Sequence, residues 1–239
     1  MSQMERIFNP KSIALIGACE KEGSVRRKLA ENLLLGKDCR AVYAVNPNRK
    51  NVLALDCFPN VSKIPEEIDL AVIATPSVTV PQIVSECGEA GVAGLLIVSA
   101  SFPEIGEEGR KLEAQIEETR KKYGMRWIGP NCVGFIRPQL NLNASFLGGN
   151  PNPGPIAFIS QNGAPSAAIL DWAVSSNIGF GLFISSGSML DVDYGDLIDY
   201  LGEEDQSVKS IPGLHGEYRQ RKEVHERGGV SQRRNQSSF

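Results

Sequence analysis

Few features of a membrane, disulfide-bonded, zinc-binding or nucleic-acid-binding protein occur in these 239 residues. No apolar run approaches the roughly 18 residues of a membrane-spanning helix, and the first ten residues lack the apolar core of a signal peptide, so we expect a cytoplasmic protein without a membrane partner. The five cysteines are odd in number and form no Cys-x-x-Cys pair, which argues against a disulfide framework and predicts no metal site. A formal net charge of −3 argues against a nucleic-acid partner.

What is present is ordinary globular composition, with 41% hydrophobic and 22% charged residues. Short apolar runs predict buried strands at residues 12–17, 41–45, 69–74, 94–98 and 125–128. Between them apolar residues recur at helical spacing, as in Val80, Ile83, Val84 and Cys87. Strands that alternate with helices predict βαβ units and a doubly wound parallel α/β sheet. We assign residues 1–140 to this first domain.

The second part of the chain begins with residues 141–155, where Asn, Gly and Pro predict a linker. A second α/β unit is predicted for residues 156–211, with only two strands, at residues 156–159 and 180–185, and helices at about 164–174 and around Leu197 and Leu201. Residues 212–239 show no periodicity and contain both histidines of the chain. We predict a disordered tail there.

A glycine turn follows the first strand, with Gly17 and Gly23 ahead of a helix that begins near Val25. Such a turn lets backbone N–H groups approach a phosphate at the positive end of a helix, although similar turns occur in sheets that bind nothing. After the second strand, Arg49 and Lys50 stand where an NAD-binding fold has a carboxylate. These cations suit a phosphorylated ribose, as in coenzyme A or NADP; alternatively, they belong to a solvated loop.

Small polar residues follow the third, fourth and fifth strands and are expected at the carboxyl rim, where doubly wound sheets bind ligands. Cys132 has no histidine partner outside the tail, so we expect a buried or ligand-adjacent thiol and assign no catalytic residue. In the second unit, residues 160–163 precede a helix that carries Pro165 in its first turn. This pattern predicts a second anion site or an ordinary helix N-cap.

Eight stretches, in this order, resemble the NDP-forming acyl-CoA synthetases, the superfamily of the succinyl-CoA synthetase α subunit. They are SIALIGA at 12–18, VNP at 45–47, EIDLAVI at 67–73, IGPNC at 128–132, LNLNASF at 140–146, IAFISQ at 156–161, AILDWA at 168–173 and DVD at 191–193. The resemblance covers residues 5–211. It implies a Rossmann-like CoA-binding domain, then a truncated flavodoxin-like, succinyl-CoA synthetase-like unit. It also implies a reversible reaction in which acid, CoA and ATP give acyl-CoA, ADP and phosphate.

The same resemblance implies coenzyme A or acyl-CoA as ligand and assigns residues to its parts. The phosphates would lie near Gly17, Ala18, Cys19, Gly23 and Ser24; the adenosine near Asn46 and Pro47; the pantetheine along Thr75, Pro76 and Ser99; and the thiol near Asn131. The phosphoryl group that the family carries on a histidine to its ATP-grasp module would face Ser160, Gln161, Asn162 and Gly163.

Departures from the family pattern limit what the resemblance implies. Asn162 and Pro165 stand where the family has serine and leucine. The phosphohistidine and ATP-grasp sequences do not occur in residues 1–239, and the residues from about Pro212 are consistent with out-of-frame translation. We therefore expect the CoA-binding portion of a synthetase, not competent alone. One alternative is a stand-alone CoA-binding regulatory module or a subunit completed by a separate ATP-grasp chain. A third hypothesis is an NADP-dependent oxidoreductase.

Overall fold

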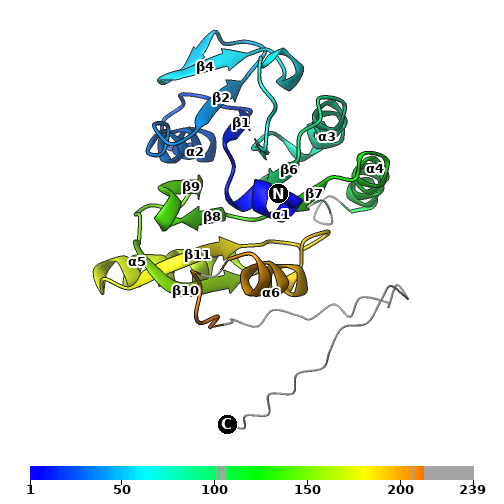
Figure 1. Cartoon of the computed structure of the whole chain (residues 1–239). Helices are drawn as coiled ribbons and strands as arrows, with labels where there is room; N and C mark the ends of the chain where they lie inside the picture. The colour runs from blue at the N-terminus through cyan, green and yellow to red at the C-terminus, as the bar shows by residue number, and fades with distance from the viewer. Residues whose placement is uncertain (101, 103–105, 206, 213–239) are drawn as a thin grey trace, which may run out of the picture.

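The larger sheet of the protein has seven strands in the order β3-β4-β2-β1-β5-β6-β7 (Figure 1). It is seen in a computed structural model that describes residues 1–100, 102, 106–205 and 207–212. The strands are β1 (Ser12–Ile16), β2 (Ala41–Val45), β3 (Asn51–Val52), β4 (Leu55–Phe58), β5 (Leu70–Ile73), β6 (Gly94–Ile97) and β7 (Arg126–Ile128). Neighbours are parallel except β3 and β4. Since β2 and β5 pair with opposite edges of β1, the predicted doubly wound sheet is confirmed.

Helices cover both faces of this sheet, which explains why its central strands are apolar throughout. Ile13 and Leu15 of β1 pack in one buried cluster with α1 (Gln3–Phe8) and α2 (Val25–Leu34). Ala14 and Ile16 point to the other face and pack in a cluster with α3 (Val80–Glu89) and α4 (Glu107–Tyr123). The alternation of side chains along β1 therefore divides the core into two layers.

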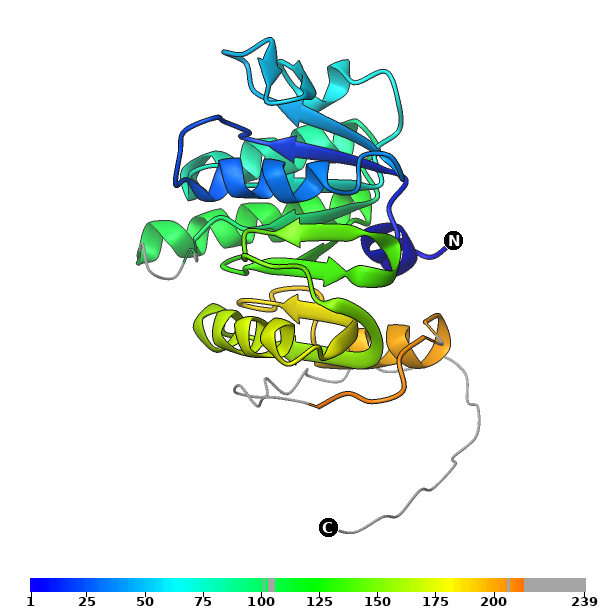
Figure 2. The same cartoon turned by 90° about the vertical axis from the view of Figure 1, so that its left-hand side faces the viewer.

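The smaller sheet has four strands in the order β10-β11-β8-β9. They are β8 (Gly134–Arg137), β9 (Leu142–Ser145), β10 (Asn152–Ser160) and β11 (Gly179–Ser185), and only β10 and β11 run parallel. One face is covered by α5 (Gly163–Ser175), through a buried cluster that contains Leu170, Phe158 and Phe183. The other face packs in one cluster with α1, α2 and α6 (Tyr194–Glu203), so the two sheets lie next to each other (Figure 2).

Two expectations about the second part need correction. Residues 142–145 of the expected linker form β9, and residues 152–155 form the start of β10. The second sheet also has four strands rather than two, because β8 and β9 form a hairpin that joins β10 and β11. Each of these added strands has four residues, and Asn141 between them adopts a left-handed φ of 50°, so apolar periodicity over so short a span gave no signal. The domain boundaries themselves stay a prediction.

The remaining expectations at this level concern the tail and the membrane. Apart from Pro212, the predicted disordered tail at residues 212–239 lies outside the described residues. Within the part of the chain that the structure describes, no helix is long and apolar enough to cross a membrane.

Candidate functional site

The predicted phosphate turn begins where β1 comes closest to the end of β5. Gly17 has a φ of 91°, and its N–H donates to the carbonyl of Val45 at 2.9 Å. A Cβ atom on Gly17 would lie 2.7 Å from Cγ2 of Thr75, closer than real Cβ atoms approach other atoms. Glycine is therefore required at position 17 for two reasons: the backbone conformation and the close approach to Thr75.

Predicted binding residues from five neighbouring strand ends contact one another along the carboxyl rim. The side-chain amide of Asn46, after β2, donates to the carbonyl of Ala18, after β1, at 2.8 Å. The Ser99 hydroxyl, after β6, donates to the carbonyl of Thr75, after β5, at 2.6 Å. The N–H of Asn131, after β7, donates to the carbonyl of Ser99 at 2.8 Å. Together with the contact between the β1 turn and Thr75, these bonds make a continuous edge from β2 to β7.

Ser24 caps the N-terminus of α2 at one end of this edge. Its hydroxyl accepts from the N–H of Arg27 at 3.2 Å and donates to the carbonyl of Lys21 at 2.7 Å. Gly23 precedes it with a φ of 70°, and a Cβ atom there would meet nothing within 4 Å. The turn thus presents the positive end of a ten-residue helix next to open space, an arrangement that suits an anion.

Cys19 lies inside the same turn, with Sγ 3.3 Å from the Ser24 hydroxyl. Burial raises the pKa of this thiol, but hydrogen bonding to Ser24 and to the backbone and the charges of Arg26 and Arg49 outweigh that effect. The pKa therefore lies below its ordinary value. Hydrogen-bond donors first, and nearby arginines second, therefore favour a negative charge at this turn, as they would for a bound phosphate.

Arg49 extends from the loop after β2 toward the β1 turn. Its guanidinium pairs with the carboxylate of Glu20 at 3.5 Å, and both side chains are about half exposed, at 52% and 43%. Exposed pairs of this kind contribute about 0–1 kcal/mol, so a phosphate could replace Glu20 as the partner of Arg49 at little cost. Lys50 is exposed in the same loop.

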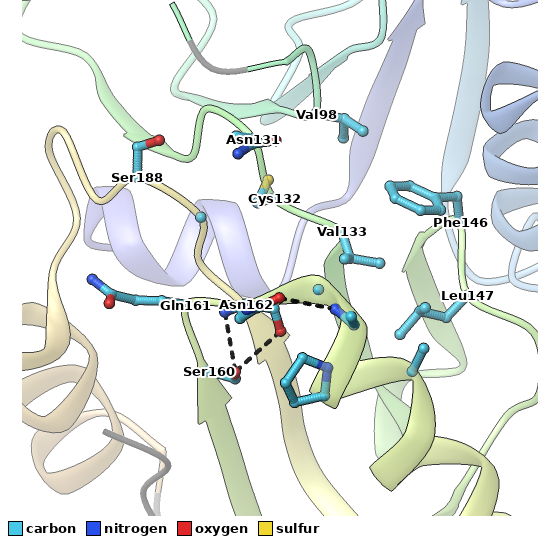
Figure 3. A pocket seen from close by; sticks show the side chains of 15 residues that line it. Val98, Asn131, Cys132, Val133, Phe146, Leu147, Ser160, Gln161, Asn162 and Ser188 are labelled. Carbon is cyan, nitrogen blue, oxygen red and sulfur yellow. Dashed lines mark hydrogen bonds between the residues drawn. The ribbon is translucent and has the colours of Figure 1, made fainter. Parts of the chain in front are cut away.

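At the other end of the edge is a cavity of about 1010 Å³ between the two sheets. Figure 3 shows Asn131 and Cys132 on one side and Ser160, Gln161 and Asn162 on the other. All five of these residues line the cavity, as does Gly163. The predicted thiol-end residue and the four predicted phosphoryl-facing residues therefore come together in one space, although they derive from different sheets.

The N-terminus of α5 forms the second wall of this cavity. Asn162 is its N-cap, and its side-chain oxygen accepts from the N–H of Ala164 at 3.1 Å. The Ser160 hydroxyl holds the backbone of Asn162 through contacts of 3.2 Å to both its N–H and its carbonyl. Asn162 thus satisfies one of the free N–H groups of the first turn, as an ordinary N-cap does, and the other N–H groups of that turn have no partner within the helix.

Cys132 is buried at the floor of the cavity, where its thiol donates to the carbonyl of Ile97 at 3.3 Å. Burial raises its pKa to about 12. A thiol in this state is a poor nucleophile, which supports the buried-thiol interpretation over a catalytic one. Within the described ranges, no group of three His, Cys, Asp or Glu side chains is placed to hold a metal ion.

Several cavity residues were not predicted. Phe146 and Leu147 follow β9, and Gly187 and Ser188 follow β11; all four line the cavity. Phe146 also lines a second cavity of about 470 Å³, together with residues 22–25 of the phosphate turn. Phe146 was within a family-like stretch, but its position between the two cavities depends on the β8–β9 hairpin. Several predicted residues line neither of these two cavities: Gly17, Ala18, Cys19, Asn46, Pro47, Thr75, Pro76 and Ser99. Two of them, Pro47 and Pro76, are also exposed beside the rim.

Comparison with protein families identifies the family of this chain. Residues 11–138 match the CoA binding domain. The chain belongs to the CoA binding domain family. This CoA-binding chain also matches the succinyl-CoA ligase like flavodoxin domain over residues 153–222, a match that extends ten residues past Pro212. The resemblance to NDP-forming acyl-CoA synthetases, the order of the two units and the binding of coenzyme A are thereby confirmed.

Relatives of this CoA-binding chain include ADP-forming acetate–CoA ligases. It is similar to acetate–CoA ligase [ADP-forming] I of Archaeoglobus fulgidus, at 42% identity over 85% of this chain and 30% of that protein. It is also similar to the alpha subunit of acetate–CoA ligase [ADP-forming] I of Pyrococcus furiosus, at 39% identity over 87% of this chain and 46% of that subunit. The chain therefore spans less than half the length of these relatives.

A solved structure is similar over most of this chain. The dinucleotide forming acetyl-coenzyme A synthetase 1 of Ca. Korarchaeum cryptofilum, in complex with phosphate and ADP, is 35% identical and superposes with a TM-score of 0.85. The similarity covers 91% of this chain and 47% of that chain.

Proposed function

We propose that this chain is the CoA-binding portion of an ADP-forming acyl-CoA synthetase, which converts acid, CoA and ATP to acyl-CoA, ADP and phosphate. The observation that carries the proposal is the continuous rim: contacts join Asn46, Ala18, Thr75, Ser99 and Asn131 from the phosphate turn to the large cavity. An elongated ligand with a phosphorylated nucleotide at one end and a thiol at the other fits such a rim.

Each part of the rim then has a role in binding. The N–H groups of residues 17–24 and the N-terminus of α2 would hold the phosphates, since both present positive potential. Arg49 would exchange Glu20 for a phosphate on the ribose. Asn46 and Pro47 would lie beside the adenosine, and Thr75, Pro76 and Ser99 beside the pantetheine. The thiol would then reach the cavity at Asn131.

The wall opposite Asn131 would hold the reacting phosphoryl oxygens. Ser160, Gln161, Asn162 and Gly163 line the cavity at the start of α5, and the free N–H groups there would stabilise negative charge during acyl transfer. We place the acyl carbon between this wall and Asn131, because the two walls belong to one cavity.

We propose that the nucleotide-dependent steps involve a separate ATP-grasp subunit. The Pyrococcus furiosus relative is named as an alpha subunit, and this chain covers 46% of it. A cytoplasmic location is part of the same proposal, since unpaired thiols such as those of the five cysteines persist in a reducing compartment.

Titration calorimetry with CoA and with NADPH tests the proposal. We expect a micromolar Kd for CoA, about −8 kcal/mol of binding free energy, and much weaker binding of NADPH. Circular dichroism establishes that the sample is folded. A folded chain that binds NADPH and not CoA would point to the oxidoreductase hypothesis, and one that binds neither would refute both.

A further inference from the structure

The loop that follows β11 belongs to the second unit but lies against the first. Its N–H groups donate to carbonyls in β7 and just after it: Val192 to Trp127 at 3.2 Å, and Ser188 to Pro130 at 2.9 Å. Gly187 begins the approach with a φ of 65°, and a Cβ atom there would lie 2.2 Å from the Pro130 carbonyl oxygen. This loop is therefore fitted closely onto the strand end that leads to Asn131.

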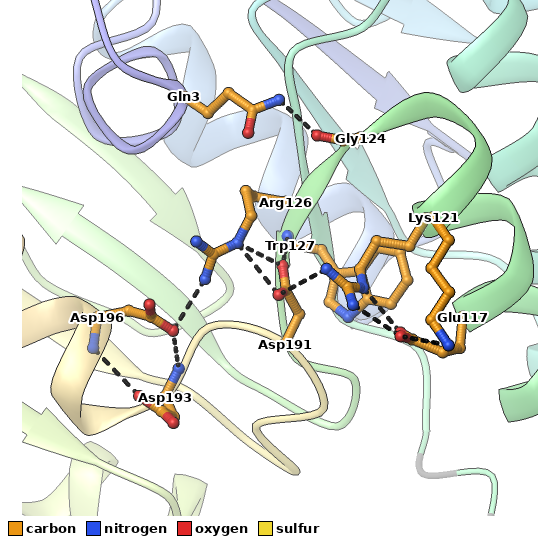
Figure 4. A network of polar contacts seen from close by, with 10 residues as sticks. Gln3, Glu117, Lys121, Gly124, Arg126, Trp127, Asp191, Asp193 and Asp196 are labelled. Atoms are coloured by element: carbon orange, nitrogen blue, oxygen red, sulfur yellow. Dashed lines mark hydrogen bonds and ion pairs between the residues drawn. The ribbon is translucent and has the colours of Figure 1, made fainter. Parts of the chain in front are cut away.

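A buried carboxylate fixes the far end of the same loop. Asp191, whose side chain is 2% exposed, accepts from Nε of Arg126 at 2.9 Å and from the N–H of Trp127 at 2.9 Å, both in β7. Arg120 of α4 adds an ion pair at 3.5 Å. Arg126 also pairs with Asp196 in the first turn of α6 at 2.8 Å. Figure 4 shows Arg126 between Asp191 and Asp196, with Trp127 beside Asp191.

This network connects to the cavity through the backbone. Residues 187 and 188 line the cavity from the loop, and residues 131 and 132 line it from the first unit. Pro130 links these two parts of the cavity wall, because it precedes Asn131 and its carbonyl accepts a hydrogen bond from the N–H of Ser188. A shift of the loop on β7 would therefore move the cavity wall at the thiol end, whereas residues 22–25 of the phosphate turn line the second cavity, which meets the first at Phe146.

We infer that Asp191 is a positioning residue that holds the loop on β7 and thereby shapes the thiol end of the CoA site. A charged group so fully buried is a weak device for stability, since removal from water offsets much of the ion-pair energy; fixing one geometry is a use that such pairs can serve. The inference rests on the proposed function, because it requires the CoA thiol to enter this cavity.

The test compares ligands that reach different parts of the rim. Acetyl-CoA should reach the cavity, whereas adenosine 3′,5′-bisphosphate should occupy the nucleotide end alone. For Asp191→Asn we expect acetyl-CoA binding to weaken at least fivefold, with the affinity for the bisphosphate within twofold of wild type. Asp205→Asn is the matched control: Asp205 pairs with Arg137 at 2.8 Å, both side chains are buried, and neither lines the cavity. It should change the ratio of the two affinities by less than twofold.

Equal weakening of both ligands by Asp191→Asn, or no weakening of either, would overturn the inference while leaving the proposed function intact. If the wild-type chain binds neither ligand, the proposed function fails and the inference with it. Should Asp191→Asn not fold, Arg120→Gln removes one partner and leaves Arg126 and the Trp127 N–H in place. This milder variant should weaken acetyl-CoA binding about twofold to threefold and leave the affinity for the bisphosphate unchanged. An unchanged ratio of the two affinities would count against a positioning role.

Discussion

Replacing Gly17 by alanine tests whether the phosphate turn is built on a close approach of two strand ends. The backbone at Gly17 has a φ of 91°, a conformation that costs an L-residue about 1–3 kcal/mol. The new Cβ would also lie 2.7 Å from Cγ2 of Thr75 and 3.1 Å from the carbonyl oxygen of Ala74. Such overpacking costs a further 1–3 kcal/mol, roughly. We therefore expect Gly17→Ala to lower the free energy of unfolding by about 2–6 kcal/mol.

Gly23→Ala separates the cost of backbone strain from the cost of steric overlap. Gly23 has a φ of 70°, but a Cβ atom there meets nothing within 4 Å, so only the backbone strain applies. With an m-value of roughly 2 kcal/mol/M in urea, the extra steric term predicts an unfolding midpoint about 0.5–1.5 M lower for Gly17→Ala than for Gly23→Ala. Fluorescence of the buried Trp127, in a Trp172→Phe background, reports on the same sheet.

The CoA affinity should follow the distortion of the turn. Gly17→Ala should weaken CoA binding at least tenfold in calorimetry, because the N–H groups of the turn move away from the phosphates. Gly202→Ala in α6, where a Cβ meets nothing within 4 Å, should leave the affinity unchanged. Equal urea midpoints for Gly17→Ala and Gly23→Ala, with unchanged CoA affinity, would show that the strand ends are not packed as described.

Two further predictions concern Cys19 in the phosphate turn and Arg49 beside it. Because the pKa of Cys19 is lowered, a larger fraction of it is thiolate at pH 7 than for an ordinary cysteine, so iodoacetamide should modify it faster than Cys132, whose pKa is raised to about 12. CoA should slow this modification, as measured by peptide mass spectrometry, and equal rates at both thiols would contradict the lowered pKa of Cys19. Arg49→Ala should weaken the binding of CoA three- to tenfold but the binding of dephospho-CoA less than twofold. Lys111→Ala, which removes an exposed cation of α4, is the control. An equal loss for both ligands would mean that Arg49 does not contact the ribose phosphate.

Five strands of the first sheet could be predicted from sequence because their information is local, whereas the short strands β3 and β4 at its edge were missed. A central parallel strand is buried on both faces, so a run such as residues 70–73 is apolar at every position and stands out without any knowledge of its neighbours. The rim could be predicted for a related reason: polar residues placed directly after such strands must lie at their carboxyl ends. Thr75, Ser99 and Asn131 contact one another as that rule requires.

The second wall of the site could not be predicted in this way, because its positions depend on contacts between distant segments. Asn162 was correctly placed at a helix N-terminus, but its place opposite Asn131 depends on how the two sheets pack. Phe146 enters the site only because β8 and β9 form a hairpin beside β11. Gly187 and Ser188 lie in a loop that contacts the first unit through their own backbone and through Asp191, which meets two arginines and a backbone N–H there. In the sequence Asp191 belongs to a family-like stretch, but its burial and its contacts with the first unit come from the fold and could not be predicted.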